Sequence, residues 1–154
     1  MPKLTSAPMK RIFSLLAGCF FVVATPLQAA EKRLPLKGKV FTIDECTAFL
    51  ILPEKPKADQ PIPWVWYAPT LPGLPANSEK WMFDRFLKAG IAIAGVDVGE
   101  SYGSPKGRSV YSALHEHLVS KRGLAKQASL LARSRGGLML YCLSLIHISE
   151  PPRP

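Results

Sequence analysis

The stretch Leu130-Leu131-Ala132-Arg133-Ser134-Arg135-Gly136-Gly137-Leu138-Met139-Leu140-Tyr141 decides the fold. A short apolar run ends abruptly at a serine between small residues, and an apolar pattern at helical spacing follows. This is the layout of a nucleophile elbow, in which a strand turns sharply into a helix and lifts a serine hydroxyl above the sheet.

An elbow crowds the backbone, so the positions two before and two after Ser134 must be small. Ala132 and Gly136 occupy them, and Ala132 departs from the first glycine of the usual G-x-S-x-G pattern. The alternative interpretation is a serine in an ordinary turn before a helix that starts with two glycines. Which of the two applies depends on the elements upstream.

Upstream of this stretch, the sequence pattern predicts strands over residues 40–43, 48–52 and 62–68, and Asp44 and Glu45 separate the first two. We expect an antiparallel opening to the sheet. A helix follows, with Asn77 or Ser78 as its cap and Gly90 at its end. Its buried face is expected to hold Trp81, Met82, Phe83, Phe86 and Leu87.

Residues 91–96 form a continuous apolar run, which is typical of a parallel strand buried on both faces. A helix over about residues 109–121, ended by Gly123, and a strand over 128–132 complete the series. This alternation predicts an α/β fold with parallel βαβαβ connections. On the second helix, His115 and His117 are two residues apart and do not face each other, so we expect solvated side chains and no metal site.

Composition restricts the class of protein. The chain has 154 residues, is 47% hydrophobic and carries a net charge of +9, but its Lys and Arg residues form no clustered stripe. We therefore expect no nucleic-acid partner. Cys19, Cys46 and Cys142 are too few and too scattered for a disulfide framework or a metal site. We expect Cys46 and Cys142 to be buried thiols; the alternative is a disulfide between them in an oxidising compartment. We expect no metal and no cofactor.

Residues 1–30 are predicted to be a secretory signal peptide, with Lys10 and Arg11 before an apolar core and a small-residue cleavage region over 27–30. The apolar core is shorter than the ~20 residues that span a bilayer. We expect export to the periplasm or outside the cell. The alternative is a lipoprotein with lipidated Cys19, which would attach the protein to the membrane, but apolar residues 20–23 continue past that cysteine.

With this order of elements, residues 40–141 resemble the N-terminal half of an α/β hydrolase. The resemblance rests on residues 64–70, 95–103 and 133–137, and within that superfamily it is to exported bacterial hydrolases of the prolyl-oligopeptidase and esterase type. It implies a fold of antiparallel opening strands followed by a parallel βαβαβ unit with a nucleophile elbow, in a domain covering residues 31–142.

The same resemblance implies chemistry. Ser134 would attack the carbonyl of a small-molecule or peptide ester or amide, and the developing oxyanion would need preorganised N–H donors. The Arg135 amide would be one donor, and the second would come from Thr70 or Leu71.

Asp97, Glu100 and Tyr102 follow the buried strand at its carboxyl end, where open α/β sheets bind their ligands. They are predicted to line the substrate pocket. The alternative is a polar turn that satisfies its own backbone.

In this fold the catalytic acid and histidine follow the nucleophile, whereas His115 and His117 precede Ser134. Residues 143–154, which include His147, resemble the translation of a transposon-type sequencing adapter, with a departure at Pro152, and are predicted to be a non-native tail. The alternative is a real C-terminal tail. We expect a serine hydrolase truncated after the elbow and inactive in this form; the alternative is a non-catalytic exported binding or scaffold module in which Ser134 is only a turn residue.

Overall fold

The computed structural model describes residues 32–56 and 59–147. The predicted signal peptide over residues 1–30, with Cys19, lies outside the described residues, as does the predicted tail from residue 148 onward. In the described ranges no helix is both long and apolar enough to cross a membrane.

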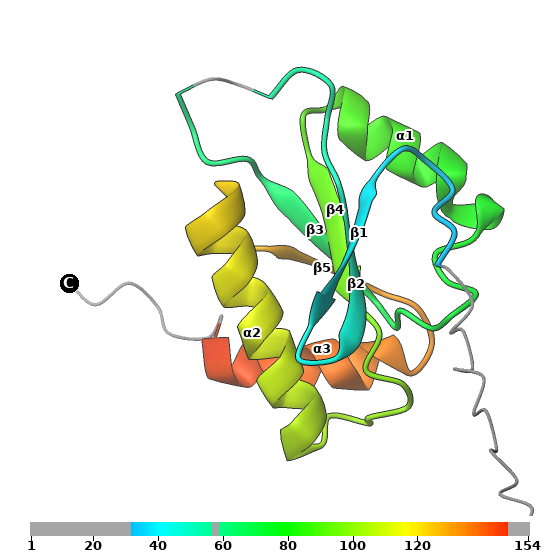
Figure 1. Cartoon of the computed structure of the whole chain (residues 1–154), viewed down its shortest axis with the longest axis vertical. Coiled ribbons are helices and arrows are strands. Elements are labelled where there is room, and N and C mark those ends of the chain that lie inside the picture. Colours follow the sequence, from blue (N-terminus) through cyan, green and yellow to red (C-terminus); the bar gives the residue numbers. More distant parts are fainter. Residues whose placement is uncertain (1–31, 57–58, 148–154) are drawn as a thin grey trace, which may run out of the picture.

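The centre of the molecule is a five-stranded sheet with the order β1-β2-β4-β3-β5 (Figure 1). β2 is antiparallel to both β1 and β4, whereas β3 is parallel to both β4 and β5. The predicted antiparallel opening and the parallel βαβαβ unit are therefore confirmed. The strands are β1 (Lys39–Ile43), β2 (Cys46–Ile51), β3 (Trp64–Ala68), β4 (Ala92–Val96) and β5 (Ser129–Ala132).

The hairpin between β1 and β2 turns through Asp44 and Glu45, whose φ angles are 44° and 64°. Positive φ at both central residues matches the right-handed twist of the flanking strands, so a two-residue loop can close the hairpin. This turn fixes the register in which Val40 faces Phe49.

Helices cover both faces of the sheet. The 3-10 turn η1 (Asn77–Glu79) and α1 (Lys80–Lys88) lie on one side, while α2 (Pro105–Arg122) and α3 (Gly136–His147) lie on the other (Figure 1). The side chains of β3 alternate between the two faces of the sheet. Trp64 and Trp66 pack against α2 and α3 on one face, whereas Tyr67 packs against Phe83 of α1 on the other. All of β4 is buried, as predicted.

α2 begins four residues earlier than predicted. The Ser104 hydroxyl accepts a hydrogen bond from the Gly107 amide at 3.3 Å, and Pro105 occupies the first turn, where its missing N–H is harmless. The expected start at Ser109 is therefore wrong, because the cap lies inside the glycine-containing loop. The end at Gly123, with φ 69°, is as predicted.

The prediction that His115 and His117 are solvated on the outer side of α2 is wrong. The His115 ring stacks on Trp66 at 6.2 Å, and the His117 ring stacks on Phe41 at 5.2 Å. Both imidazoles are half-buried, because each lies against an aromatic ring of the sheet. Burial and the charges of Arg122 and Lys121 lower the pKa of His117.

The start of the first helix also differs from the prediction. Neither Asn77 nor Ser78 caps it; instead the Glu79 carboxylate accepts a hydrogen bond from the Ala76 amide at 2.8 Å. Trp81 precedes Phe83 by two positions, about 200° around the helix axis. It therefore faces away from the sheet and is 67% exposed, while Phe83 is fully buried. Trp81 was therefore wrongly placed in the core.

Cys46 and Cys142 are free thiols, but both are half-buried rather than buried. Cys46 begins β2 next to the hairpin turn, which leaves one side of it open, and Cys142 lies against Gly103 of the loop before α2. Burial, reinforced by nearby Asp97, raises the pKa of the Cys46 thiol.

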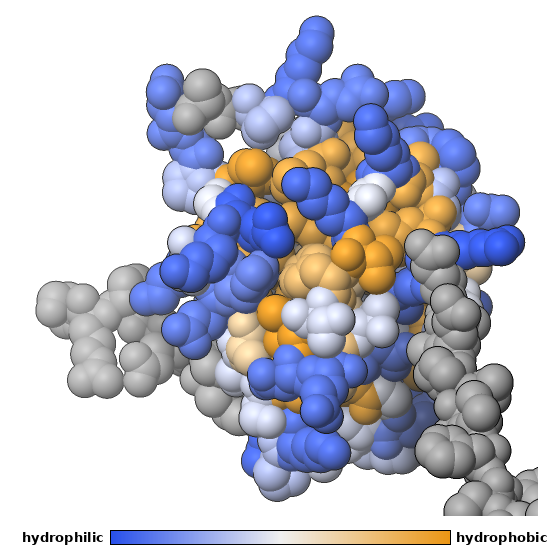
Figure 2. Space-filling model, viewed as in Figure 1, coloured by the Kyte–Doolittle hydropathy of each residue, from blue (hydrophilic) through white to orange (hydrophobic). Residues whose placement is uncertain are grey.

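The two edges of the sheet retain exposed apolar side chains. Figure 2 shows apolar surface over the part of the molecule where Figure 1 places β1, and Val40 of β1 is 43% exposed. At the opposite edge β5 pairs only with β3, and Leu130 is 38% exposed.

α3 runs through residue 143, at which the predicted tail begins. Leu143 is buried in the same cluster as Met139 and Leu140 of this helix. The apolar face of α3 therefore packs into the core as far as Leu143.

Phe83 and Trp81 of α1 provide a matched pair for testing the packing. Phe83→Ala should lower the free energy of unfolding by about 3–5 kcal/mol, because it removes a fully buried ring. Trp81→Ala should change it by less than about 0.5 kcal/mol, because that ring lies mostly in solvent. Urea denaturation of both variants measures the difference, and equal losses would contradict this placement of α1.

Candidate active site

The loops that follow β3, β4 and β5 lie at one end of the sheet, at the lower right of Figure 1. Because these strands are parallel, their carboxyl ends all lie at this end of the sheet. Thr70 and Leu71 follow β3, Asp97 to Tyr102 follow β4, and Ser134 follows β5. Open α/β sheets bind their ligands at the carboxyl ends of their strands.

Ser134 is exposed and has a left-handed backbone, with φ 50°. A non-glycine residue in that region costs roughly 1–3 kcal/mol and persists only where the surroundings enforce it. Two of the other three such residues, Asp44 and Glu45, form the hairpin turn. Ser134 instead stands between the end of β5 and the start of α3, where a strand is forced directly into a helix.

Gly136 shows why small residues are needed there. A Cβ added at Gly136 would collide with the Ala68 carbonyl group and the Pro69 nitrogen, so the first turn of α3 rests on the backbone that ends β3. A Cβ at Gly137 would meet nothing closer than the Ala132 Cβ at 3.9 Å. The small-residue requirement predicted for position 136 therefore has a direct steric cause.

The three backbone amides that were predicted as oxyanion donors are free of backbone acceptors. Those of Thr70, Leu71 and Arg135 donate to no acceptor among the described residues. The carbonyl of Leu71, in contrast, is held by the Lys32 ammonium at 2.8 Å and by the Leu74 amide at 2.9 Å.

The side chains around Thr70 and Leu71 are also fixed. The buried Thr70 hydroxyl donates to the Tyr67 carbonyl at 3.1 Å. The Lys32 side chain, only 7% exposed, reaches the loop from the start of the described chain. Burial lowers the pKa of Lys32, and the charge of Asp97 partly opposes this.

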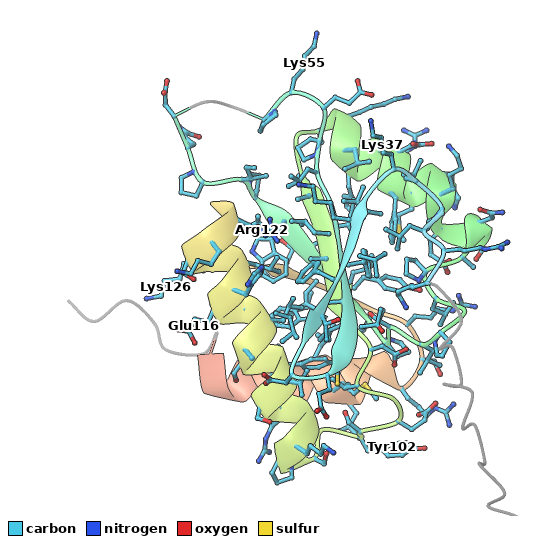
Figure 3. The ribbon with its side chains drawn as sticks, in the orientation of Figure 1. Lys37, Lys55, Tyr102, Glu116, Arg122 and Lys126 are labelled. Atoms are coloured by element: carbon cyan, nitrogen blue, oxygen red, sulfur yellow. The ribbon has the colours of Figure 1, made fainter. Side chains whose placement is uncertain are left out.

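The loop after β4 places its three predicted residues differently. Glu100 forms an ion pair with Arg135 at 2.8 Å, which brings it to the elbow. Asp97 accepts a hydrogen bond from the Gly99 amide at 3.0 Å, as in a polar turn that satisfies its own backbone. Tyr102 is 50% exposed and points outward from the lower edge of the molecule (Figure 3).

Sequence reasoning missed Glu79, which is 7% exposed although carboxylates are normally solvated. Its Oε2 accepts from the Ala76 amide at 2.8 Å and from the Ser78 hydroxyl at 2.9 Å, and its Oε1 accepts from Arg133 at 2.6 Å. The spacing from Ala76 is that of a capping box, which could have indicated the first contact. The sequence carries no signal for the partner 54 residues away.

The environment of Glu79 sets its charge state. Burial raises the pKa of Glu79, but the hydrogen bonds from Ala76 and Ser78 and the charge of Arg133 outweigh this, so the pKa lies below its ordinary value. Nearby, burial and the Glu79 charge raise the pKa of Tyr67, and the adjacent Arg133 guanidinium partly opposes this.

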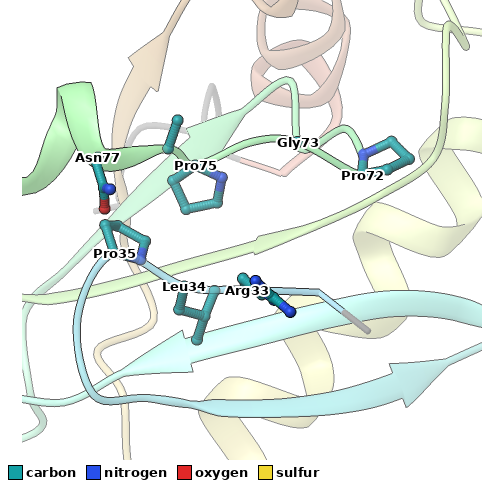
Figure 4. A pocket seen from close by; sticks show the side chains of 8 residues that line it. Arg33, Leu34, Pro35, Pro72, Gly73, Pro75 and Asn77 are labelled. Carbon is teal, nitrogen blue, oxygen red and sulfur yellow. The ribbon is translucent and has the colours of Figure 1, made fainter. Parts of the chain in front are cut away.

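A groove of about 570 Å³ lies beside the loop after β3, between that loop and the start of the described chain (Figure 4). None of the predicted site residues lines it. Three prolines give it an apolar wall. The lining residues are Arg33, Leu34, Pro35, Pro72, Gly73, Pro75, Ala76 and Asn77.

No group of three or more His, Cys, Asp or Glu side chains that could hold a metal ion occurs within residues 32–56 and 59–147. At the turn, Ser134 places a hydroxyl group between Arg133 and Arg135.

Among known proteins, only solved structures are similar to this chain. No family model and no curated protein matches the sequence. Oligopeptidase B from Trypanosoma brucei, with covalently bound antipain, matches with 20% identity and a TM-score of 0.53 over 71% of this chain and 18% of that chain. Oligopeptidase B from Leishmania major matches with 17% identity and a TM-score of 0.52 over 70% and 18%.

An α/β serine hydrolase without a lid from Xanthomonas campestris is also similar, with 21% identity and a TM-score of 0.49 over 73% of this chain and 57% of that one. The chain thus spans 18% of the oligopeptidase B chains and little more than half of this smaller hydrolase. The two oligopeptidase B matches show the fold: this chain has part of an α/β-hydrolase fold, as the sequence predicted.

The two glycines after the elbow differ in the space around them and can be tested against each other. Gly136→Ala should lower the free energy of unfolding by about 1–3 kcal/mol, because the added methyl overpacks against the Ala68 carbonyl. Gly137→Ala should be neutral or stabilising by up to about 1 kcal/mol, because it lies in a helix with room for a methyl. Chemical denaturation distinguishes them, and tolerance of alanine at both positions would rule out this contact.

The lowered pKa of Glu79 predicts a pH dependence of stability. As the pH falls, the unfolded chain takes up the proton before the folded chain does, so the stabilisation is complete above the ordinary carboxyl pKa and is lost below it. Wild type should therefore exceed Glu79→Gln in free energy of unfolding at pH 7, and the difference should shrink by pH 3. Glu116→Gln, which alters an exposed side chain of α2, should keep the wild-type profile.

Proposed function

We propose that this chain is the nucleophile-bearing part of an exported serine hydrolase that transfers the acyl group of an ester or amide to water. The observation that carries the proposal is the left-handed backbone of Ser134, an exposed non-glycine residue at a strand-to-helix turn. Strain of this kind gathers at functional sites, where it fixes a reacting group.

In the proposed reaction the Ser134 oxygen attacks the substrate carbonyl carbon, and the carbonyl π electrons move to the oxygen. The amide of Arg135, together with that of Thr70 or Leu71, would donate to this oxyanion. Their lack of acceptors among the described residues supports the role, because donors held ready in advance need not be released from other bonds.

Ser134 also needs a base to accept its proton. His115 and His117 are engaged with the aromatic rings of Trp66 and Phe41, on the face of the sheet covered by α2. In our proposal the base and its orienting acid come from later strands of the complete protein, as the order of residues in this fold implies. The proposal includes export directed by residues 1–30.

A fluorophosphonate probe tests the proposal on the protein expressed from its full genomic reading frame. Ser134→Ala should reduce labelling and ester hydrolysis at least ~10⁴-fold, because the nucleophile is removed. The matched control Ser129→Ala alters an exposed serine on β5 and should retain labelling. Absence of labelling from wild type would favour the non-catalytic binding module instead. Labelling that persists in Ser134→Ala would overturn the assignment of Ser134 as the nucleophile.

A further inference from the structure

One arginine holds both ends of the loop that carries Thr70 and Leu71. The Arg133 amide donates to the carbonyl of Ala68, the last residue of β3, at 2.8 Å. The Arg133 guanidinium donates to the carboxylate of Glu79, which lies eleven residues after Ala68 at the far end of the loop, at 2.6 Å. The backbone and the side chain of the residue just before Ser134 therefore bind opposite ends of one loop.

The Glu79 end of this contact is rigid. The carboxylate is 9% exposed, and its second oxygen is already bound to the Ala76 amide and the Ser78 hydroxyl. An ion pair between two exposed side chains is worth little, whereas removing the partner of a buried carboxylate leaves it uncompensated. The pair with Arg133 therefore holds although the arginine side chain itself is 53% exposed.

This arrangement bears on the geometry of the proposed oxyanion donors, which come from two separate segments. One donor follows Ser134, and the other lies on the loop between Ala68 and Glu79. Two donors serve one oxygen only if their separation is fixed to a fraction of an ångström (about 0.5 Å). The close approach of Gly136 to Ala68 fixes the segments at one point, and the contact between Arg133 and Glu79 adds a second.

We propose that Arg133 and Glu79 are positioning residues: together they hold the loop bearing the second oxyanion donor in register with the elbow. This inference rests on the proposed function for its catalytic consequence. Arg133 acts through the loop and does not need to touch the substrate. The expected effect is on the transition state, where the oxyanion exists, and not on substrate binding.

The structural half of the proposal is tested on the chain itself by hydrogen exchange. Glu79→Gln and Arg133→Met should each speed exchange of the Leu74 and Arg133 amides at least tenfold, because these amides are bonded to the Leu71 and Ala68 carbonyls of the loop. Amides of β4 should be unaffected. The matched control Asp84→Asn breaks an exposed ion pair on α1 and should leave the loop as in wild type. Unchanged exchange at both amides would overturn the proposal.

The catalytic half is tested by hydrolysis of a p-nitrophenyl ester by the protein expressed from its full reading frame. Each variant should lower kcat about 10–100-fold with KM nearly unchanged, since loss of one oxyanion donor costs about 10²–10³-fold. Arg133→Lys should restore part of kcat, and the double variant should be no worse than the poorer single one. Additive losses, or a rise in KM with constant kcat, would overturn the positioning role.

The two experiments separate the possible failures. An inactive wild-type protein would overturn the proposed function and, with it, the catalytic role of the pair. Hydrogen exchange would still decide whether Arg133 holds the loop, because it requires no turnover.

Discussion

The arrangement of this end of the molecule depends on the contact between the backbone of Gly136 and the carbonyl of Ala68. Because no side chain separates them, the first turn of α3 lies directly on the end of β3. Ser134 is then confined to a left-handed turn, and the loop after β3 starts beside it. A methyl group at position 136 would push the two segments apart, so the absence of one atom sets the geometry of the candidate site.

The elements that sequence analysis predicted well are those set by local patterns. The continuous apolar run of residues 91–96 marked β4, because a strand buried on both faces is apolar throughout. Gly90 and Gly123 marked the ends of helices, because a left-handed φ favours glycine. The elbow was recognisable for the same reason. Its small residues are close in sequence, so the steric demand could be read from neighbouring positions.

Several predictions failed because they depend on contacts between distant segments. His115 and His117 have no local feature that distinguishes a solvated imidazole from one stacked on the rings of β1 and β3. Glu79 pairs with Arg133 across 54 positions. Tertiary packing decides these contacts, and a single sequence does not record them.

The exposure of Trp81 has a spectroscopic consequence. Of the three tryptophans in the chain, Trp64 and Trp66 are buried with ring centroids 5.1 Å apart, while Trp81 lies mostly in water. Its emission therefore changes little on unfolding and dilutes the signal of the other two. Replacing Trp81 by phenylalanine leaves a buried tryptophan pair whose emission reports on the packing of β3 against α2 and α3.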